Sequence, residues 1–258
     1  MSKDRSPRRR PEAHNYRNRP RRSFRWTVPW RWIAAFVPLI AVAVGTYALL
    51  QSSLLDVQQV RIEGTRSLDQ ASLVEISGLE GESMLTLSSE GAIRRLTTIP
   101  AIRGVNIQRS WPNDVVVTIE ERVPVAYWSV AGHDYPVDVE GVLLSGGAPD
   151  GAAPRIIDVN PGRVLAPGDK VQPDAIAFAR RIQAESPRFL DASVVELEYE
   201  AGIGVTAVFD GGTRVTFGDE RSYEYKIAVL SALLDDLANQ GVQPTAVDLR
   251  FGERVTYE

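Results

Sequence analysis

The sequence contains no cysteine and only two histidines among its 258 residues. Without cysteine the chain can form no disulfide, no thiolate metal site and no thiol nucleophile. The histidines, His14 and His133, belong to no H-E-x-x-H motif, and neither G-x-S-x-G nor G-x-x-x-x-G-K-[ST] occurs. Asp235 and Asp236 are adjacent in a predicted helix, so their carboxylates do not converge as an acid–base pair. We therefore expect no catalytic residues, no metal and no cofactor.

Charge is also absent from one long stretch, the 18 residues of Ile33–Leu50. At about 1.5 Å per residue, a helix of this length approaches the thickness of a membrane hydrocarbon core. The pattern predicts a single transmembrane helix over residues 32–54. A cleaved signal peptide is the alternative, but the apolar run is longer than is usual for one and no small-x-small cleavage site follows Leu50.

The net charge of −4 combines two segments of opposite sign. Residues 1–31 carry eleven Lys or Arg against two acidic residues (+9), and the remainder carries 18 basic against 31 acidic residues (−13). Because basic segments stay in the cytoplasm, residues 55–258 should be extracytoplasmic. The tail lacks periodic apolar residues, which predicts disorder. Topology and contact with anionic lipid explain its charge best, ahead of a cytoplasmic protein partner and of DNA, so we expect no nucleic acid partner.

Residues 55–124 predict the order β-α-α-β-β. Leu73 and Ile76 should face inward from the first helix, and Val115, Val117 and Ile119 from the last strand. The predicted elements are a strand over Val57–Glu63, a helix that Ser67 caps and Gly78 ends, a helix that starts at Ser88 or Ser89 and ends before Pro100, and a hairpin of Ile102–Arg109 with Val115–Arg122.

Residues 125–258 predict a mixed β domain with flanking helices. Ser145–Pro154 is rich in Gly, Ala and Pro and should be an exposed loop. The predicted elements are a helix from Pro173 to about Ala184, strands over Val194–Tyr199, Gly204–Asp210 and Thr213–Phe217, a helix over Ser222–Asn239, and terminal strands over Val247–Phe251 and Arg254–Tyr257. The fold class is therefore α+β.

Several short motifs, in order and spacing, resemble the FtsQ/DivIB family of bacterial cell-division proteins. They are Arg109-Ser110-Trp111-Pro112-Asn113, Glu121-Arg122-Val123-Pro124-Val125-Ala126, the D-x-x-G-V run from Asp138 to Val142, and Asp248-Leu249-Arg250-Phe251. The resemblance implies four segments: a basic cytoplasmic tail over 1–31, the transmembrane helix over 32–54, a POTRA domain over 55–124 and an extracytoplasmic β domain over 125–258.

The resemblance also implies a function. The chain would be a non-enzymatic divisome scaffold in the cell membrane at the division septum, linking early cytoplasmic components to septal peptidoglycan synthesis. FtsB/FtsL-like bitopic partners would dock on the C-terminal strand, and other divisome components on the POTRA domain.

Carried onto this sequence, the partner contacts are Arg250, Phe251, Val255 and Tyr257. Phe251 and Tyr257 could instead only close the core of the domain. Two other functions stay open: a POTRA-bearing envelope chaperone or transport accessory, and a membrane-anchored envelope enzyme with a converging carboxylate pair.

Overall fold

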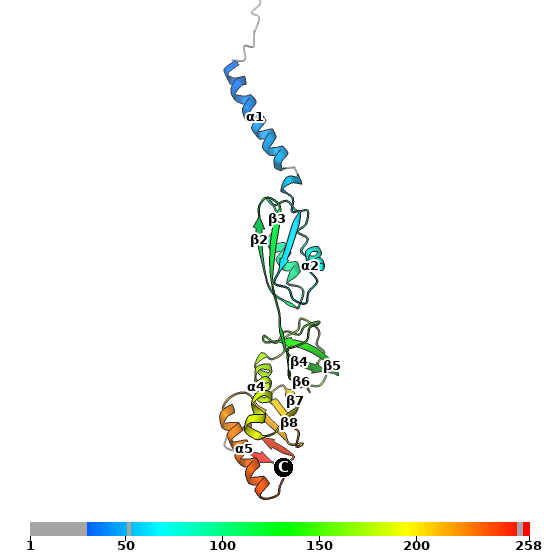
Figure 1. Ribbon diagram of the computed structural model, residues 1–258, viewed down its shortest axis with the longest axis vertical. Coiled ribbons are helices and arrows are strands. Elements are labelled where there is room, and N and C mark those ends of the chain that lie inside the picture. The colour runs from blue at the N-terminus through cyan, green and yellow to red at the C-terminus, as the bar shows by residue number, and fades with distance from the viewer. Residues whose placement is uncertain (1–29, 51–52, 252–254) are drawn as a thin grey trace, which may run out of the picture. The chain divides into compact units, whose positions relative to one another are not determined.

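The computed structural model describes residues 30–50, 53–251 and 255–258 (Figure 1). The chain divides into two compact units, Met1–Gln51 and Ser52–Glu258. The predicted disordered tail lies outside the described residues up to position 29, and helix α1, Trp30–Leu50, begins directly after them. No helix in the described part of the chain meets the length and hydropathy required of a membrane span. Seven large apolar side chains of α1 are more than half exposed: Phe36, Val37, Leu39, Ile40, Val42, Val44 and Tyr47.

The second unit begins with a short 3-10 turn, Ser53–Leu55, and a three-stranded sheet, called here the small sheet. Strand β1 pairs in parallel with β3, and β3 pairs antiparallel with β2, in the order β1-β3-β2. This arrangement confirms the predicted order β-α-α-β-β. The elements are β1 (Gln59–Glu63), α2 (Gln70–Ser77), α3 (Ser89–Leu96), β2 (Ile102–Ser110) and β3 (Asp114–Glu121).

The two helices and one face of the small sheet enclose a separate apolar core. Val115, Val117 and Ile119 alternate inward along β3, as their period-two spacing predicts. Leu73 and Leu96 are fully buried from the helices. The expectation for Ile76 is wrong, since 40% of it is exposed at the end of the short helix α2.

The caps of the helices correct one further prediction. Asp69, not Ser67, is the N-cap of α2, and its carboxylate accepts a hydrogen bond from the Ser72 amide at 2.9 Å. The Ser67 amide and hydroxyl instead donate to Glu121 at the end of β3. Gly78 ends α2 in the left-handed conformation (φ 58°), as predicted, because a residue without a Cβ adopts it readily.

The chain continues into an eight-stranded sheet, called here the large sheet, with the order β11-β10-β9-β8-β7-β6-β4-β5. Strands β6, β4 and β5 were not predicted as separate elements, because short buried strands between glycine-rich turns carry little alternation. The elements are β4 (Pro124–Val130), β5 (His133–Asp138), β6 (Arg155–Asp158), α4 (Pro173–Leu190), β7 (Val194–Glu200), β8 (Gly204–Phe209), β9 (Arg214–Gly218), α5 (Tyr223–Asn239), β10 (Ala246–Asp248) and β11 (Thr256–Tyr257).

Helices α4 and α5 pack against each other, and α4 packs against β7 and β8. An aromatic cluster lies at the centre of this packing. Phe178 of α4 meets the ring of Tyr223 at 5.4 Å and that of Phe217 at 6.2 Å, both edge to face. This is the arrangement that the quadrupoles of aromatic rings prefer, so it stabilises the core beyond the area that it buries.

We expect Leu96→Ala to lower the free energy of unfolding by about 2–5 kcal/mol, because Leu96 is fully buried and its truncation leaves a cavity in the core. Leu85→Ala is the matched control, because Leu85 is 43% exposed and a surface substitution changes stability by only about 0.5 kcal/mol. Urea unfolding followed by circular dichroism measures both. Equal losses for the two variants would contradict the description of this core.

Candidate partner-binding surface

The large sheet ends at β11, the last strand of the chain. β11 contains only Thr256 and Tyr257, and both are exposed. It pairs antiparallel with β10, and β10 pairs in parallel with β9. A strand in this position presents one row of backbone groups to its neighbour and the other row to its surroundings.

The register of β11 determines which backbone groups point outward. Val247 lies opposite Tyr257 and Asp248 lies opposite Thr256. Glu258 donates its amide to the Ala246 carbonyl at 3.0 Å. Because hydrogen-bonded and non-hydrogen-bonded pairs alternate in an antiparallel ladder, the N–H and C=O of Tyr257 face away from β10.

The side chains of Val255 and Tyr257 share one face of the sheet, the face of buried Val247. Val255 is half-buried and packs against the core of the large sheet. Tyr257 is 52% exposed and Phe251 is 65% exposed. Of the predicted contacts, Val255 therefore belongs in part to the core, whereas the two aromatic side chains present most of their surface outward.

Arg250 and Phe251 lie in the turn that follows β10. The Asp248 carboxylate accepts from Arg250 Nε at 3.0 Å and Nη2 at 2.6 Å, and also from the Arg250 backbone amide at 2.9 Å. These side-chain hydrogen bonds lower the pKa of Asp248 and raise that of Arg250. The Arg250 guanidinium lies 5.1 Å from the centre of the Phe251 ring. Asp248 thus holds the arginine next to the exposed aromatic ring.

This turn shortens the predicted strand Val247–Phe251 to Ala246–Asp248. The Asp248 side chain bonds to the amide two residues ahead, and a local bond of this kind competes with strand pairing. The predicted strand Arg254–Tyr257 is likewise reduced to Thr256–Tyr257, and Arg254 lies outside the described residues. The predicted contacts Arg250 and Phe251 accordingly belong to a turn, and Tyr257 belongs to the edge strand.

A pocket of about 730 Å³ adjoins this turn, between it and the start of α5. Gly218, with φ 78°, permits the close approach of Arg250, because a Cβ there would lie 3.0 Å from Arg250 Cγ. Lys226 lies beneath, almost fully buried, and donates to the carbonyls of Phe217 and Asp219 at 2.8 Å each. Burial lowers the pKa of Lys226. The pocket also contains residues that our sequence reasoning missed: Gly202, Ile203, Asp219, Arg221, Ser222 and Tyr225.

The other end of the large sheet, β5, is partly covered. Pro136 has no amide hydrogen, and its carbonyl accepts from the Leu144 amide at 2.7 Å. Val137 forms an isolated bridge with Leu143. Coverage of this kind protects a sheet edge from pairing with other chains, and it distinguishes the β5 end from the β11 end. Among the described residues, no group of three or more His, Asp or Glu is placed to hold a metal ion.

Both parts of the second unit match models of known protein families. Residues 55–122 match the model of the FtsQ-type POTRA domain, and residues 126–250 match the model of the C-terminal part of cell division protein FtsQ/DivIB. A protein of Chloroflexus aurantiacus called cell division protein FtsQ is 27% identical over 86% of this chain and 84% of its own length. A protein of the same name from Corynebacterium glutamicum is 22% identical over 76% of this chain and 90% of its own length.

We expect Asp248→Asn to loosen the turn that carries Arg250 and Phe251 while leaving the fold intact. The pair is partly exposed, so the free energy of unfolding should fall by no more than about 1 kcal/mol. Amide hydrogen exchange should accelerate at Arg250, whose N–H donates to this carboxylate, and stay unchanged at Val215 in β9. Equal exchange at Arg250 in both proteins would show that the carboxylate does not hold the turn.

Proposed function

Because the chain belongs to the FtsQ/DivIB family of cell division proteins, we propose that it is a non-enzymatic scaffold of the divisome. It acts in the cell membrane at the division septum and links early cytoplasmic division components to septal peptidoglycan synthesis. Its partners there are FtsB/FtsL-like bitopic proteins, and recognition, not chemistry, is its activity.

The observation that carries this proposal is the open edge of β11 with Tyr257 and Phe251 exposed beside it. An extended segment of an FtsB-like partner adds to β11 as a further strand, a mode in which backbone hydrogen bonds give affinity and side-chain pockets give specificity. The outward backbone groups of Tyr257 set the register of that strand. Arg250, Phe251, Val255 and Tyr257 are the proposed contacts of that strand.

An envelope chaperone or transport accessory is less well supported. Such a protein must accept many chains, and it would benefit from a broad apolar surface without fixed polar groups. Here Arg250 is held in a bidentate pair with Asp248, and the exposed strand is only 2 residues long. A short edge beside a fixed arginine favours one specific partner.

We also propose a separate role for each segment of the chain. Residues 32–54 anchor the protein in the membrane, with the basic tail, 1–31, in the cytoplasm. The POTRA domain, 55–124, contributes to recruitment, and the β domain, 125–258, holds the bitopic partners. The uncharged run of Ile33–Leu50 and the exposed apolar side chains of α1 support the anchor. Confinement to one membrane raises the effective concentration of the partners for each other.

We expect Phe251→Ala and Tyr257→Glu each to weaken binding of a purified FtsB/FtsL-like ectodomain complex from the same organism. Buried aromatic anchors at interfaces contribute about 2 kcal/mol or more, which corresponds to a rise in Kd of about thirtyfold. Titration calorimetry with the full chain in detergent measures this. Val164→Glu is the matched control, because Val164 is 90% exposed in a loop remote in sequence from β11.

Unchanged circular dichroism and melting of the variants would show that the loss is local. Full binding by both aromatic variants would move the contact away from β11 and leave the scaffold proposal standing. No binding by the unaltered chain would count against the scaffold role itself.

The anchor has its own test. The full chain should float with liposomes in a density gradient, and Val42→Arg combined with Val44→Arg should reduce the floating fraction strongly, since one arginine at a membrane centre costs about 2.5–3.5 kcal/mol. Gln58→Arg, outside the proposed span, should float like the unaltered chain. An unaltered chain that stays at the bottom of the gradient would refute the anchor.

A further inference from the structure

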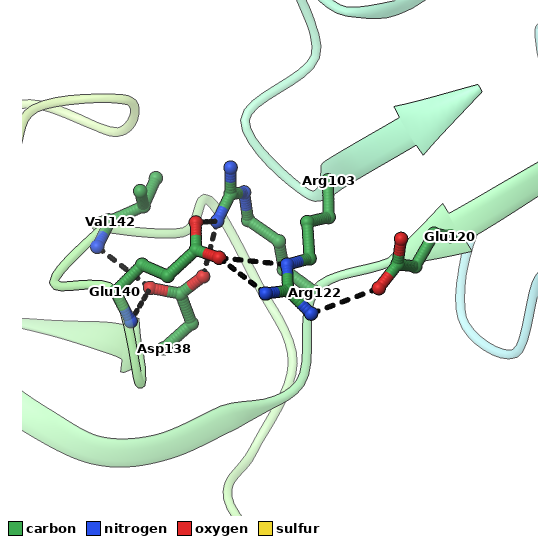
Figure 2. Close-up of polar contacts among 6 residues, drawn as sticks. All are labelled: Arg103, Glu120, Arg122, Asp138, Glu140 and Val142. Carbon is green, nitrogen blue, oxygen red and sulfur yellow. Dashed lines mark hydrogen bonds and ion pairs between the residues drawn. The ribbon is translucent and has the colours of Figure 1, made fainter.

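Five charged side chains gather where the small sheet is joined to the large sheet (Figure 2). Arg103 of β2, Glu120 of β3 and Arg122, which directly follows β3, come from the part that matches the POTRA model. Asp138, at the end of β5, and Glu140, in the turn after it, come from the part that matches the C-terminal model. The charges therefore pair across the boundary between the two parts.

Glu140 contacts both arginines, as Figure 2 shows. One carboxylate oxygen, Oε1, accepts from Arg103 Nε at 2.8 Å and lies 2.6 Å from Arg103 Nη2. The other, Oε2, accepts from Arg122 Nη1 at 2.8 Å. A carboxylate shared between two guanidinium groups in this way is a strong, directional arrangement. Removing this one carboxylate would break two bridges at once.

The turn that presents Glu140 is itself rigid. Asp138 Oδ1 accepts from the amides of Glu140 at 3.0 Å and Val142 at 2.8 Å. Gly141 has φ 80°, and a Cβ at this position would lie 2.3 Å from the Val171 carbonyl oxygen. No other residue fits there without displacing the backbone. Glu140 is therefore held in position by its turn before it meets either arginine.

The covalent connection between the sheets is short. β3 ends at Glu121 and β4 begins at Pro124, so only Arg122 and Val123 lie between them. Glu121 is tied back to the small sheet, because its carboxylate accepts from the Arg66 amide at 2.6 Å. The Arg122 amide donates to the Ala101 carbonyl at 2.8 Å, so rotation between the sheets is confined to the backbone bonds that follow this amide, in Arg122 and Val123. Arg122 is also the residue whose side chain the ion pairs hold.

The ion pairs across the boundary differ in exposure. In the inner pair, Arg122 Nη1 lies 2.5 Å from Asp138 Oδ2, and these side chains are only 13% and 4% exposed. In the outer pair the Arg103 and Glu140 side chains are 48% and 35% exposed. Salt screens exposed pairs much more than buried ones, with a Debye length of about 8 Å at 0.15 M and about 3 Å at 1 M. We therefore expect salt to weaken the outer pair, Arg103 with Glu140, much more than the inner pair.

We propose that the ion pairs of Glu140 with Arg103 and Arg122, called here the latch, fix the orientation of the small sheet relative to the large sheet. While these ion pairs are formed, the two sheets keep one relative orientation. With Glu140 neutralised, the Arg122–Asp138 pair remains. With the outer pair screened, only the pairs that Arg122 forms with Asp138 and Glu140 remain. In both cases the orientation becomes variable.

Low pH should weaken the latch, as high salt does. Hydrogen bonds from Arg122 and from Arg103 lower the pKa of Glu140 below its usual 4.5. A carboxylate with a depressed pKa contributes fully above about pH 4.5 and loses its contribution as the pH falls through the lowered value. The other titratable groups that face it are Asp138, across Arg122, and Glu120, which shares Arg103 at 2.9 Å. The latch should hold at neutral pH and release only in acid.

The absence of cysteine makes the test clean, because two introduced cysteines can be spin-labelled without background. We would label Gln108→Cys on β2 and Val195→Cys on β7, both on exposed strand positions, and measure the distance distribution by double electron–electron resonance in the full chain. Glu140→Gln should broaden or shift the distribution, and 1 M salt should do the same to the unaltered chain.

Glu120→Gln is the matched control, because Glu120 pairs with the same arginine but lies in the small sheet with it. It should leave the distribution unchanged. A second label pair, Val195→Cys on β7 with Gln240→Cys at the C-cap of α5, lies entirely within the part that contains the large sheet and shows whether each variant is folded. Identical distributions for the unaltered chain, Glu140→Gln and Glu120→Gln would overturn the latch, and so would equal broadening by the two glutamine variants.

Discussion

The packing of Phe217 against Phe178 and Tyr223 is the interaction on which the C-terminal end of the structure depends. It fixes β9 beneath helices α4 and α5. β9 then provides the template for β10, and β10 the template for β11. The buried ammonium of Lys226 bonds to the carbonyls of Phe217 and Asp219 and so closes the end of the same strand. The exposed edge is thus two strands removed from the core that positions it.

The two edge strands of the large sheet, β5 and β11, differ in how far other segments cover them. At β5 a proline and a returning segment occupy part of the edge. At β11 the register leaves the backbone groups of Tyr257 outward, with an apolar face continued from Val247 through Tyr257. A protein that exposes an edge must limit what pairs with it, and a very short strand next to a fixed arginine imposes that limit here.

Two partly exposed ion pairs of the described residues connect neighbouring parts of the fold. Asp248 with Arg250, and Glu140 with Arg103, are both partly exposed, and pairs of this kind add little to the free energy of folding. Asp248, at the end of β10, binds Arg250 in the turn that follows, and Glu140, in the turn after β5, binds Arg103 of β2. The first pair joins β10 to the turn that carries Phe251, and the second crosses the boundary between the sheets.

The sequence by itself determined the elements whose signals are local. The period of two in Val115, Val117 and Ile119 predicted β3, Gly78 predicted the end of α2, and the order of short motifs predicted the family, since all of these depend on neighbours a few residues apart. Ser67 was a wrong cap because Glu121, 54 positions away, engages it. The strand after Val247 was too long because Asp248 turns the chain. The outward groups of β11 and the bridging position of Glu140 depend on register and on contacts between distant segments. Only the tertiary structure decides these, because no local pattern records which distant group will lie opposite.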